Sequence, residues 1–253
     1  DELGQLARDF NVLARTLEAN EGARRQFMAD VSHELRTPLA VLRGELEALE
    51  DGIRAPTPEA IASLQHETRA LAKLVDDLYA LALADIGALT YRYDDVDVGE
   101  LVTATVPAVR DAAAARGIEV ATTLAGDGAL VAFADADRLR QLLAGLLDNA
   151  LRYTTAPGRV EIACGREGGH IAIDVRDSAP GVADADLPRL FERFYRVEGS
   201  RSREHGGAGL GLAICRSIVA AHGGMIEARP SPLGGLWIAV RLPVAGPAHG
   251  APA

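Results

Sequence analysis

The first fifty residues carry apolar side chains at helical spacing, and this pattern limits the fold more than any other feature. A first series steps by three and four, and a second continues it; their members are Leu3, Leu6, Phe10, Leu13 and Leu17, then Phe27, Val31, Leu35, Leu39, Leu42, Leu46 and Leu49. The first series has the spacing of a heptad seam, which would need a partner helix. The alternative is an ordinary amphipathic helix that packs on its own domain. Gly52 is placed to end the helix.

A second helix is predicted over 58–84. Thr57 is a suitable N-cap, and Pro58 is favourable at the first helical position. Two long helices joined by a short turn form an antiparallel hairpin, which cannot bury both of its apolar stripes alone. We therefore expect a homodimer in which two hairpins build a four-helix bundle.

The first helix carries one group of residues with reactive potential. His33 lies off the centre of the apolar stripe, Glu34 follows it, and Thr37 lies one turn beyond. A carboxylate beside an imidazole can hold its tautomer and accept its proton, which makes the other ring nitrogen a better nucleophile. A single histidine on a helix is more often a surface or packing residue. Pro38 is expected to bend the helix just past the histidine.

The second half mixes helices and strands, which favours an α+β sandwich of one sheet against helices. A short extended linker is expected over 87–97. Helices are predicted over 98–116, 137–153, 187–193 and 211–222, and strands over 118–124, 129–134, 159–164, 170–177, 225–229 and 235–242.

Two polar groups in this half suit a nucleotide. Asn149 offers an oxygen ligand for Mg²⁺ held against phosphates, Arg152 could contact a phosphate, and Tyr153 could stack on a base. Asp177 follows a strand, where its carboxylate could accept from the amine of adenine, and Gly181 allows a close backbone approach. The alternatives are a core helix with a polar outer face and an ordinary turn.

A charged, glycine-rich loop over 197–208 follows an aromatic segment. Such a loop is typical of a mobile lid whose cations bind a triphosphate, and Arg196, directly before the loop, would be one of these cations. Small residues before the helix at 211 would expose backbone amides to an anion; the residues of this run that we assign to nucleotide binding are Gly207, Gly209, Leu210 and Gly211. A glycine pattern alone is a weak signal.

Composition restricts the remaining possibilities. The net charge of −10 and the pI near 5.1 argue against general nucleic-acid binding, which needs clustered cations. Cys164 and Cys215 are isolated and are expected to be reduced core residues. No run of eighteen apolar residues occurs, and the chain starts within a helical pattern without Met, which suggests a fragment of something longer.

Residues 32–39 (SHELRTPL) resemble the H-box of sensor histidine kinases. Residues 1–11 resemble the last helix of a HAMP linker, and the four blocks of the second half resemble, in order, the N, G1, F and G2 boxes of the ATP-binding domain shared with gyrase, Hsp90-type chaperones and MutL proteins. The segments around Asp177 and 191–196 are similar to those of the envelope-stress type of sensor kinase.

The resemblance implies an ATP-dependent protein-histidine kinase with a Bergerat-type ATP-binding fold. His33 would be the phosphoacceptor, Glu34 its general base, and Thr37 would orient the water that dephosphorylates a partner. ATP and Mg²⁺ would be the cofactors. The phosphate would pass to the receiver domain of a response regulator, and the chain would be the cytoplasmic portion of a bacterial inner-membrane protein whose transmembrane sensor segment lies upstream.

The expected domains are the end of a HAMP or signalling helix (1–25), a dimerisation and phosphotransfer hairpin (26–86), a catalytic ATP-binding domain (95–244) and a disordered tail (245–253). Two positions depart from the family pattern: Gly145 stands where many members have Asn, and Ala179 where Gly is usual. Two other hypotheses remain at this stage, namely an ATP-hydrolysing clamp or chaperone of the same superfamily and a degenerate dimeric scaffold that does not bind ATP.

Overall fold

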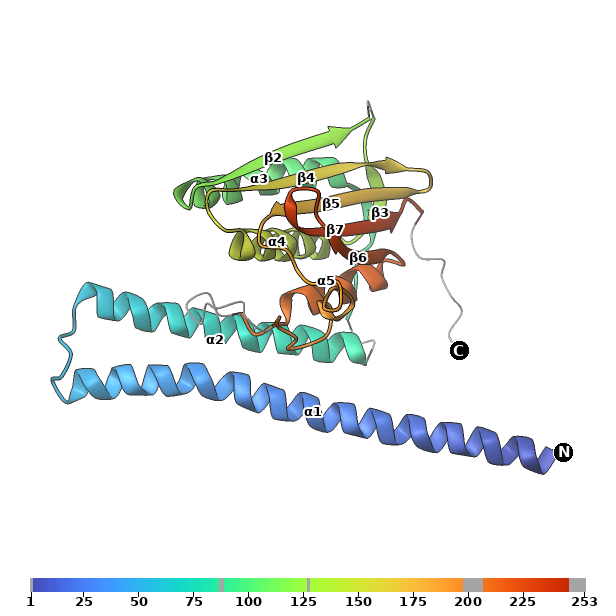
Figure 1. Ribbon diagram of the computed structural model, residues 1–253, viewed down its shortest axis with the longest axis horizontal. Helices are drawn as coiled ribbons and strands as arrows, with labels where there is room; N and C mark the ends of the chain where they lie inside the picture. The colour runs from blue at the N-terminus through green and yellow to red at the C-terminus, as the bar shows by residue number, and fades with distance from the viewer. Residues whose placement is uncertain (1, 87–88, 127, 198–206, 246–253) are drawn as a thin grey trace. The chain divides into compact units, whose positions relative to one another are not determined.

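The computed structural model describes residues 2–86, 89–126, 128–197 and 207–245 of the 253-residue chain (Figure 1). Residues 198–206 of the predicted lid and 246–253 of the predicted tail lie outside the described residues. The chain divides into two compact units, 1–76 and 77–253, and each is described by itself. Among the described helices, none has an apolar stretch long enough to cross a membrane.

The first unit is a helical hairpin, as predicted. Helix α1 (Glu2–Glu50) runs through Pro38 without a break, and helix α2 (Pro58–Asp85) begins after a turn in which Gly52 has a φ of 70°. Thr57 caps α2, because its hydroxyl accepts a hydrogen bond from the Ala60 amide at 3.3 Å. The helices are joined near the turn by Glu45, whose carboxylate accepts from the Ser63 hydroxyl at 2.9 Å.

Large apolar side chains of the hairpin remain exposed to solvent in the single chain. Leu39, Leu46 and Ile61 keep 52%, 54% and 48% of their surface accessible. A helix stripe of this kind is normally covered by another helix. The hairpin as it stands therefore leaves apolar surface without a cover.

The second unit is one sheet with helices against it. A five-stranded sheet has the order β2-β4-β5-β7-β6, in which β2 and β4 are parallel and the other neighbours antiparallel. Its strands are β2 (Ile118–Ala125), β4 (Gly158–Glu167), β5 (His170–Ser178), β6 (Met225–Pro230) and β7 (Gly234–Pro243). The helices are α3 (Val98–Ala115), α4 (Ala136–Tyr153) and α5 (Gly211–Ala221).

The core lies between the sheet and these helices, which Figure 1 shows on one side of the strands. Helix α4 buries an unbroken leucine stripe there, consisting of Leu139, Leu142, Leu143, Leu146, Leu147 and Leu151. Alternate residues of the central strand, such as Ile171 and Ile173, face this stripe and are at most 1% exposed. The predicted α+β sandwich is confirmed.

Two predicted elements were wrong in extent. The helix predicted over 187–193 is only a 3₁₀ turn, η1 (Leu187–Arg189), and the residues after it form turns and a bend. The expected linker over 87–97 ends in a strand, β1 (Asp94–Asp97), which pairs antiparallel with β3 (Val131–Ala134). Three of the four residues of β1 are Asp, so its sequence lacked the apolar alternation that marks a strand.

A buried polar pair links α4 to α5. His222, which ends α5 and is 2% exposed, accepts a hydrogen bond at Nε2 from the Asp135 amide at 3.0 Å. Its Nδ1 therefore carries the proton and donates to the Ile218 carbonyl at 2.7 Å. Burial lowers the pKa of His222, because the charged imidazolium is poorly solvated there, although the Asp135 carboxylate opposes this shift.

This linkage predicts acid sensitivity. A folded-state pKa below the unfolded value of about 6.5 means that the stabilisation by neutral His222 is complete above pH 6.5 and is lost as the pH falls below it. Between pH 7.5 and 5.5, wild type should therefore lose unfolding free energy relative to His222→Gln, measured by urea denaturation. Parallel pH dependence of the two proteins would contradict the assignment.

Candidate nucleotide and phosphoacceptor sites

The predicted phosphoacceptor His33 lies on α1, in the first unit, with Glu34 and Thr37, which were predicted to assist it. The side chain of His33 is exposed, and that of Glu34 is half-buried. The Thr37 hydroxyl donates to the His33 carbonyl at 3.3 Å, so its oxygen lone pairs remain available as acceptors. The imidazole is thus accessible to a reactant, with a carboxylate on the neighbouring residue.

In the second unit the structure joins the C-terminal end of α4 to the turn after β5. The Thr155 amide donates to the Ala179 carbonyl at 3.0 Å, and the Arg159 amide donates to the Ser178 hydroxyl at 2.9 Å. These bonds hold the end of α4, which carries Asn149 and Arg152, beside the end of β5, which carries Asp177. Asn149 and Asp177, which are 28 positions apart in the chain, therefore lie on neighbouring elements.

Asp177 is the most perturbed acid of this site. It is 4% exposed, and its Oδ1 accepts a hydrogen bond from the Leu236 amide at 2.7 Å. Burial raises the pKa of Asp177 to about 7, and the Leu236 hydrogen bond offsets only part of that effect. A buried carboxylate with one such donor can accept a further hydrogen bond from a ligand.

The start of β7 shapes this part of the site, and sequence reasoning missed it. A Cβ on Gly235 would overlap Oδ1 of Asp177 and would lie 2.6 Å from the Asp177 carbonyl oxygen. A Cβ on Gly181 would lie 3.1 Å from the Gly234 carbonyl. The one available signal was the Gly234-Gly235 pair at the start of a strand, where glycine often marks a close backbone approach.

The segments that flank the predicted lid are hydrogen-bonded to each other. The Phe194 amide donates to the Gly209 carbonyl at 3.0 Å, and both residues have positive φ angles, 61° and 69°. A Cβ on Gly209 would lie 2.8 Å from the Phe194 carbonyl carbon, so glycine is required here. A Cβ on Gly207 would overlap the guanidinium of Arg152, which places the end of the lid against α4.

The remaining predicted residues differ in their exposure. Asn149 and Arg152 are half-buried, whereas Tyr153 and Arg196 are exposed, so all four can meet a solute. Leu210 is 1% exposed and contributes packing and its backbone, and Gly211 begins α5. Leu210 is the N-cap of α5, and the small residues Ala208 and Gly209 precede it, an arrangement that suits anion binding at a helix start.

The structure gives a packing reason for Gly145, one of the two departures from the family pattern. A Cβ at this position would lie 2.9 Å from Sγ of Cys215, at the crossing of α4 and α5. The absence of a side chain thus lets the two helices approach. Ala179 is exposed, and its carbonyl accepts the Thr155 hydrogen bond, which any residue can do.

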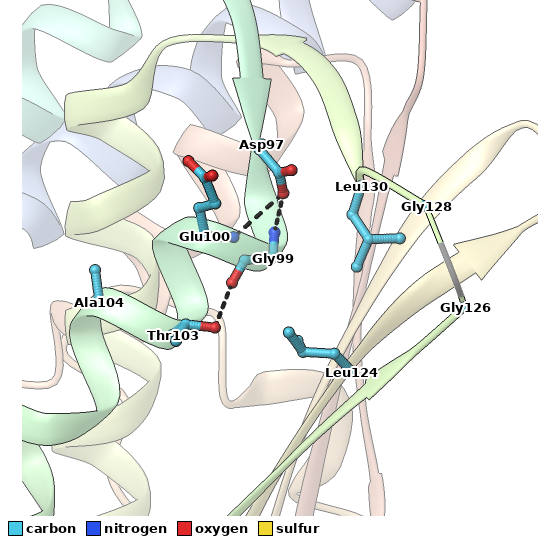
Figure 2. Close-up of a pocket in the computed structure, with 9 residues that line it drawn as sticks. All are labelled: Asp97, Gly99, Glu100, Thr103, Ala104, Leu124, Gly126, Gly128 and Leu130. Carbon is cyan, nitrogen blue, oxygen red and sulfur yellow. Dashed lines mark hydrogen bonds between the residues drawn. The ribbon is translucent and has the colours of Figure 1, made fainter.

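A cavity of about 390 Å³ lies elsewhere, between the start of α3 and the end of β2 (Figure 2). Figure 2 shows Leu124 and Leu130 directed into it and Asp97 at its edge. Asp97 caps α3 by accepting from the amides of Gly99 and Glu100 at 2.9 and 3.2 Å. The cavity is lined by none of the predicted site residues, so we do not assign it to the nucleotide.

Comparison with known families agrees with the two-part organisation. Residues 23–87 match the His Kinase A (phospho-acceptor) domain, and residues 134–246 match the histidine kinase-, DNA gyrase B- and HSP90-like ATPase. The chain therefore belongs to the histidine-protein kinase family.

Among individual relatives, the chain is similar to the signal transduction histidine-protein kinase BaeS of Escherichia coli strain K12, with 54% identity over 244 residues. This match covers 96% of the chain and 52% of BaeS, so the chain spans about half the length of that relative. The similarity supports the envelope-stress subtype expected from the sequence.

Solved structures of histidine kinases share the fold. The histidine kinase AdeS of Acinetobacter baumannii is 27% identical with a TM-score of 0.71, and the match covers 84% of this chain and 98% of AdeS. Full-length ShkA, solved in complex with AMPPNP, is 30% identical with a TM-score of 0.65, covering 87% of this chain and 46% of ShkA.

The close approach at Gly235 yields a prediction for stability. Gly235→Ala should lower the unfolding free energy by about 2 kcal/mol or more, because the methyl group cannot avoid Asp177 without moving β7. Gly169→Ala is the control, since a Cβ there meets nothing within 4 Å. Chemical denaturation of both variants tests this, and equal stability of the two would show that the strand adjusts freely.

Proposed function

We propose that this chain phosphorylates itself on His33 with the γ-phosphate of ATP and then transfers the phosphoryl group to an aspartate of a response regulator. The observation that carries the proposal is the combination, in one chain, of an exposed histidine in a phospho-acceptor domain with an ATPase domain that contains the buried carboxylate of Asp177. Neither part alone would specify a histidine kinase.

Nucleotide binding would use the joined elements of the second unit. Asp177 would accept a hydrogen bond from the adenine amine, and Gly181 would allow the base to approach the backbone. The amides beside Gly209 and Gly211, with Arg152 and Arg196, would bind the phosphates, and Tyr153 could stack on the base.

The donor set suits Mg²⁺ bound together with its nucleotide. Among the described residues, no three His, Cys, Asp or Glu side chains gather into a metal cage. Asn149 offers one neutral oxygen from a half-buried position, and Mg²⁺ commonly binds through one or two protein oxygens plus substrate phosphates and waters. When bound, the ion would neutralise phosphate charge during the transfer.

Phosphoryl transfer would proceed by attack of a His33 ring nitrogen on the γ-phosphorus. The bond from that phosphorus to the bridging oxygen breaks, and ADP leaves. Glu34 would accept the imidazole proton, which keeps the phosphorylated ring neutral. A regulator's aspartate oxygen would then take the phosphoryl group from nitrogen. Thr37 would orient the water for the reverse, dephosphorylating activity.

The assembly would be a homodimer and the cytoplasmic part of a membrane sensor. The uncovered apolar residues of α1 and α2 support dimerisation, because a four-helix bundle would remove them from water. The half-length match to BaeS supports a longer protein with a sensor segment outside this chain. The expected domain boundaries, 1–25, 26–86 and 95–244, stay part of this proposal.

The two other hypotheses fit less well. A clamp or chaperone needs no phospho-acceptor domain, yet residues 23–87 match one. A scaffold that does not bind ATP drew support from Gly145 and Ala179, but Gly145 is accounted for by packing against Cys215.

Incubation with γ-³²P-labelled ATP and Mg²⁺ tests the acceptor. Wild type should acquire acid-labile, alkali-stable label, and His33→Ala should lose it, because no other imidazole replaces the nucleophile. His66→Ala, which alters an exposed histidine of α2, is the matched control and should label like wild type. Label that persists in His33→Ala would refute the acceptor assignment.

Asp177→Asn tests the adenine contact. Because the amine of adenine requires an acceptor, the ionised carboxylate binds best, and ATP affinity of wild type should fall up to about tenfold per pH unit below pH 7. The variant should bind at least about tenfold more weakly at pH 8, with a flatter pH dependence. Calorimetric titration at pH 6, 7 and 8 measures both, and wild-type affinity in the variant would exclude the contact.

A further inference from the structure

The chain segment between α2 and β1 is fastened to the ATPase domain by a small cluster that the proposed reaction does not use. The Arg92 amide donates to Oδ2 of Asp135 at 2.8 Å, and the Tyr93 hydroxyl donates to the Ala221 carbonyl at 2.8 Å. We call the segment Tyr91–Tyr93, together with Asp135 and His222, the linker clamp.

Aromatic packing reinforces the linker clamp. The rings of Tyr91 and Tyr93 meet the His222 ring edge-on, with centroids 5.5 and 5.3 Å apart. Tyr93 also stacks on Phe133, 5.8 Å away, at an interplanar angle of 14°. The linker therefore contacts the domain through both hydrogen bonds and ring faces.

The two carboxylate oxygens of Asp135 accept hydrogen bonds from different elements. Oδ1 caps α4 by accepting from the amides of Asp137 and Arg138 at 3.0 and 3.1 Å, while Oδ2 holds the Arg92 amide. The Asp135 amide in turn donates to His222 at the end of α5. One buried acid, 7% exposed, thus connects the linker to the ends of both α4 and α5.

These ends are the ones remote from the nucleotide residues. Asn149 and Arg152 lie in the last two turns of α4, which has 18 residues and is roughly 27 Å long at about 1.5 Å per residue. Gly209 and Gly211 lie at the start of α5, whereas His222 is at its end. The linker clamp can therefore influence the domain's position without touching bound nucleotide.

We propose that Asp135 is a positioning residue for phosphoryl transfer, because it fixes the direction in which the linker leaves the ATPase domain toward the phosphoacceptor hairpin. This inference rests on the proposed kinase activity. Transfer requires the two reacting groups to meet in a narrow geometry, and a loosened linker would make productive encounters rarer. The expected defect lies in kcat, and the KM for ATP stays unchanged.

Asp135→Asn separates the two tasks of this residue. The amide oxygen can still cap α4, but its NH₂ group is a donor and cannot hold the Arg92 amide. In the full chain, autophosphorylation at saturating ATP should slow about threefold or more, with the KM for ATP within about twofold of wild type. Tyr93→Phe, which removes only the hydroxyl, should act in the same direction, and Tyr79→Phe on the exposed face of α2 is the control.

Hydrogen exchange at the Arg92 amide provides a readout that does not depend on kinase activity. Wild type should protect this amide, and Asp135→Asn should expose it without a general loss of protection in α4. Unchanged kcat in both variants, or a KM that rises in step with the fall in kcat, would overturn the positioning role. Absence of labelling in wild type would contradict the proposed function instead, and an unprotected Arg92 amide in wild type would overturn the linker clamp itself.

Discussion

The packing of α4 against α5 is the interaction on which the second unit depends. Both helices cover the same face of the sheet, and Gly145 lets them approach at Cys215. Their opposite ends serve different purposes. One end of the pair carries residues for which we propose nucleotide binding, and the other end holds the linker through Asp135 and His222. A shift in this helix pair would therefore move the groups at both of its ends.

The buried acid Asp177 departs from what stability alone would favour. Asp177 has a pKa raised to about 7 by burial, so at higher pH the fold holds an ionised carboxylate that is poorly solvated. Gly235 keeps the strand close enough for a hydrogen bond from the Leu236 amide to Oδ1 of Asp177. A ligand's donor would offset part of this cost, which couples binding to the ionisation of the site.

The hairpin differs from the second unit, because it leaves apolar surface uncovered and exposes His33. The role that we propose for His33 needs only accessibility and a neighbouring carboxylate, both of which a helix provides locally. The exposed residues such as Leu39 and Leu46 require a further helical surface. In the function that we propose, the histidine and the nucleotide residues therefore lie in different compact units of the chain.

The sequence by itself determined the hairpin and the α+β class and supplied the site residues that we propose, because helical periodicity, caps and short motifs are local properties. Thr57 at the start of α2 and Asp177 at the end of β5 were both placed correctly. Only the tertiary structure decided that Gly235 closes on Asp177, that Gly145 is a helix contact, and that Asp94–Asp97 forms a strand. Each of these depends on a neighbour distant in the chain, which no local pattern of residues encodes.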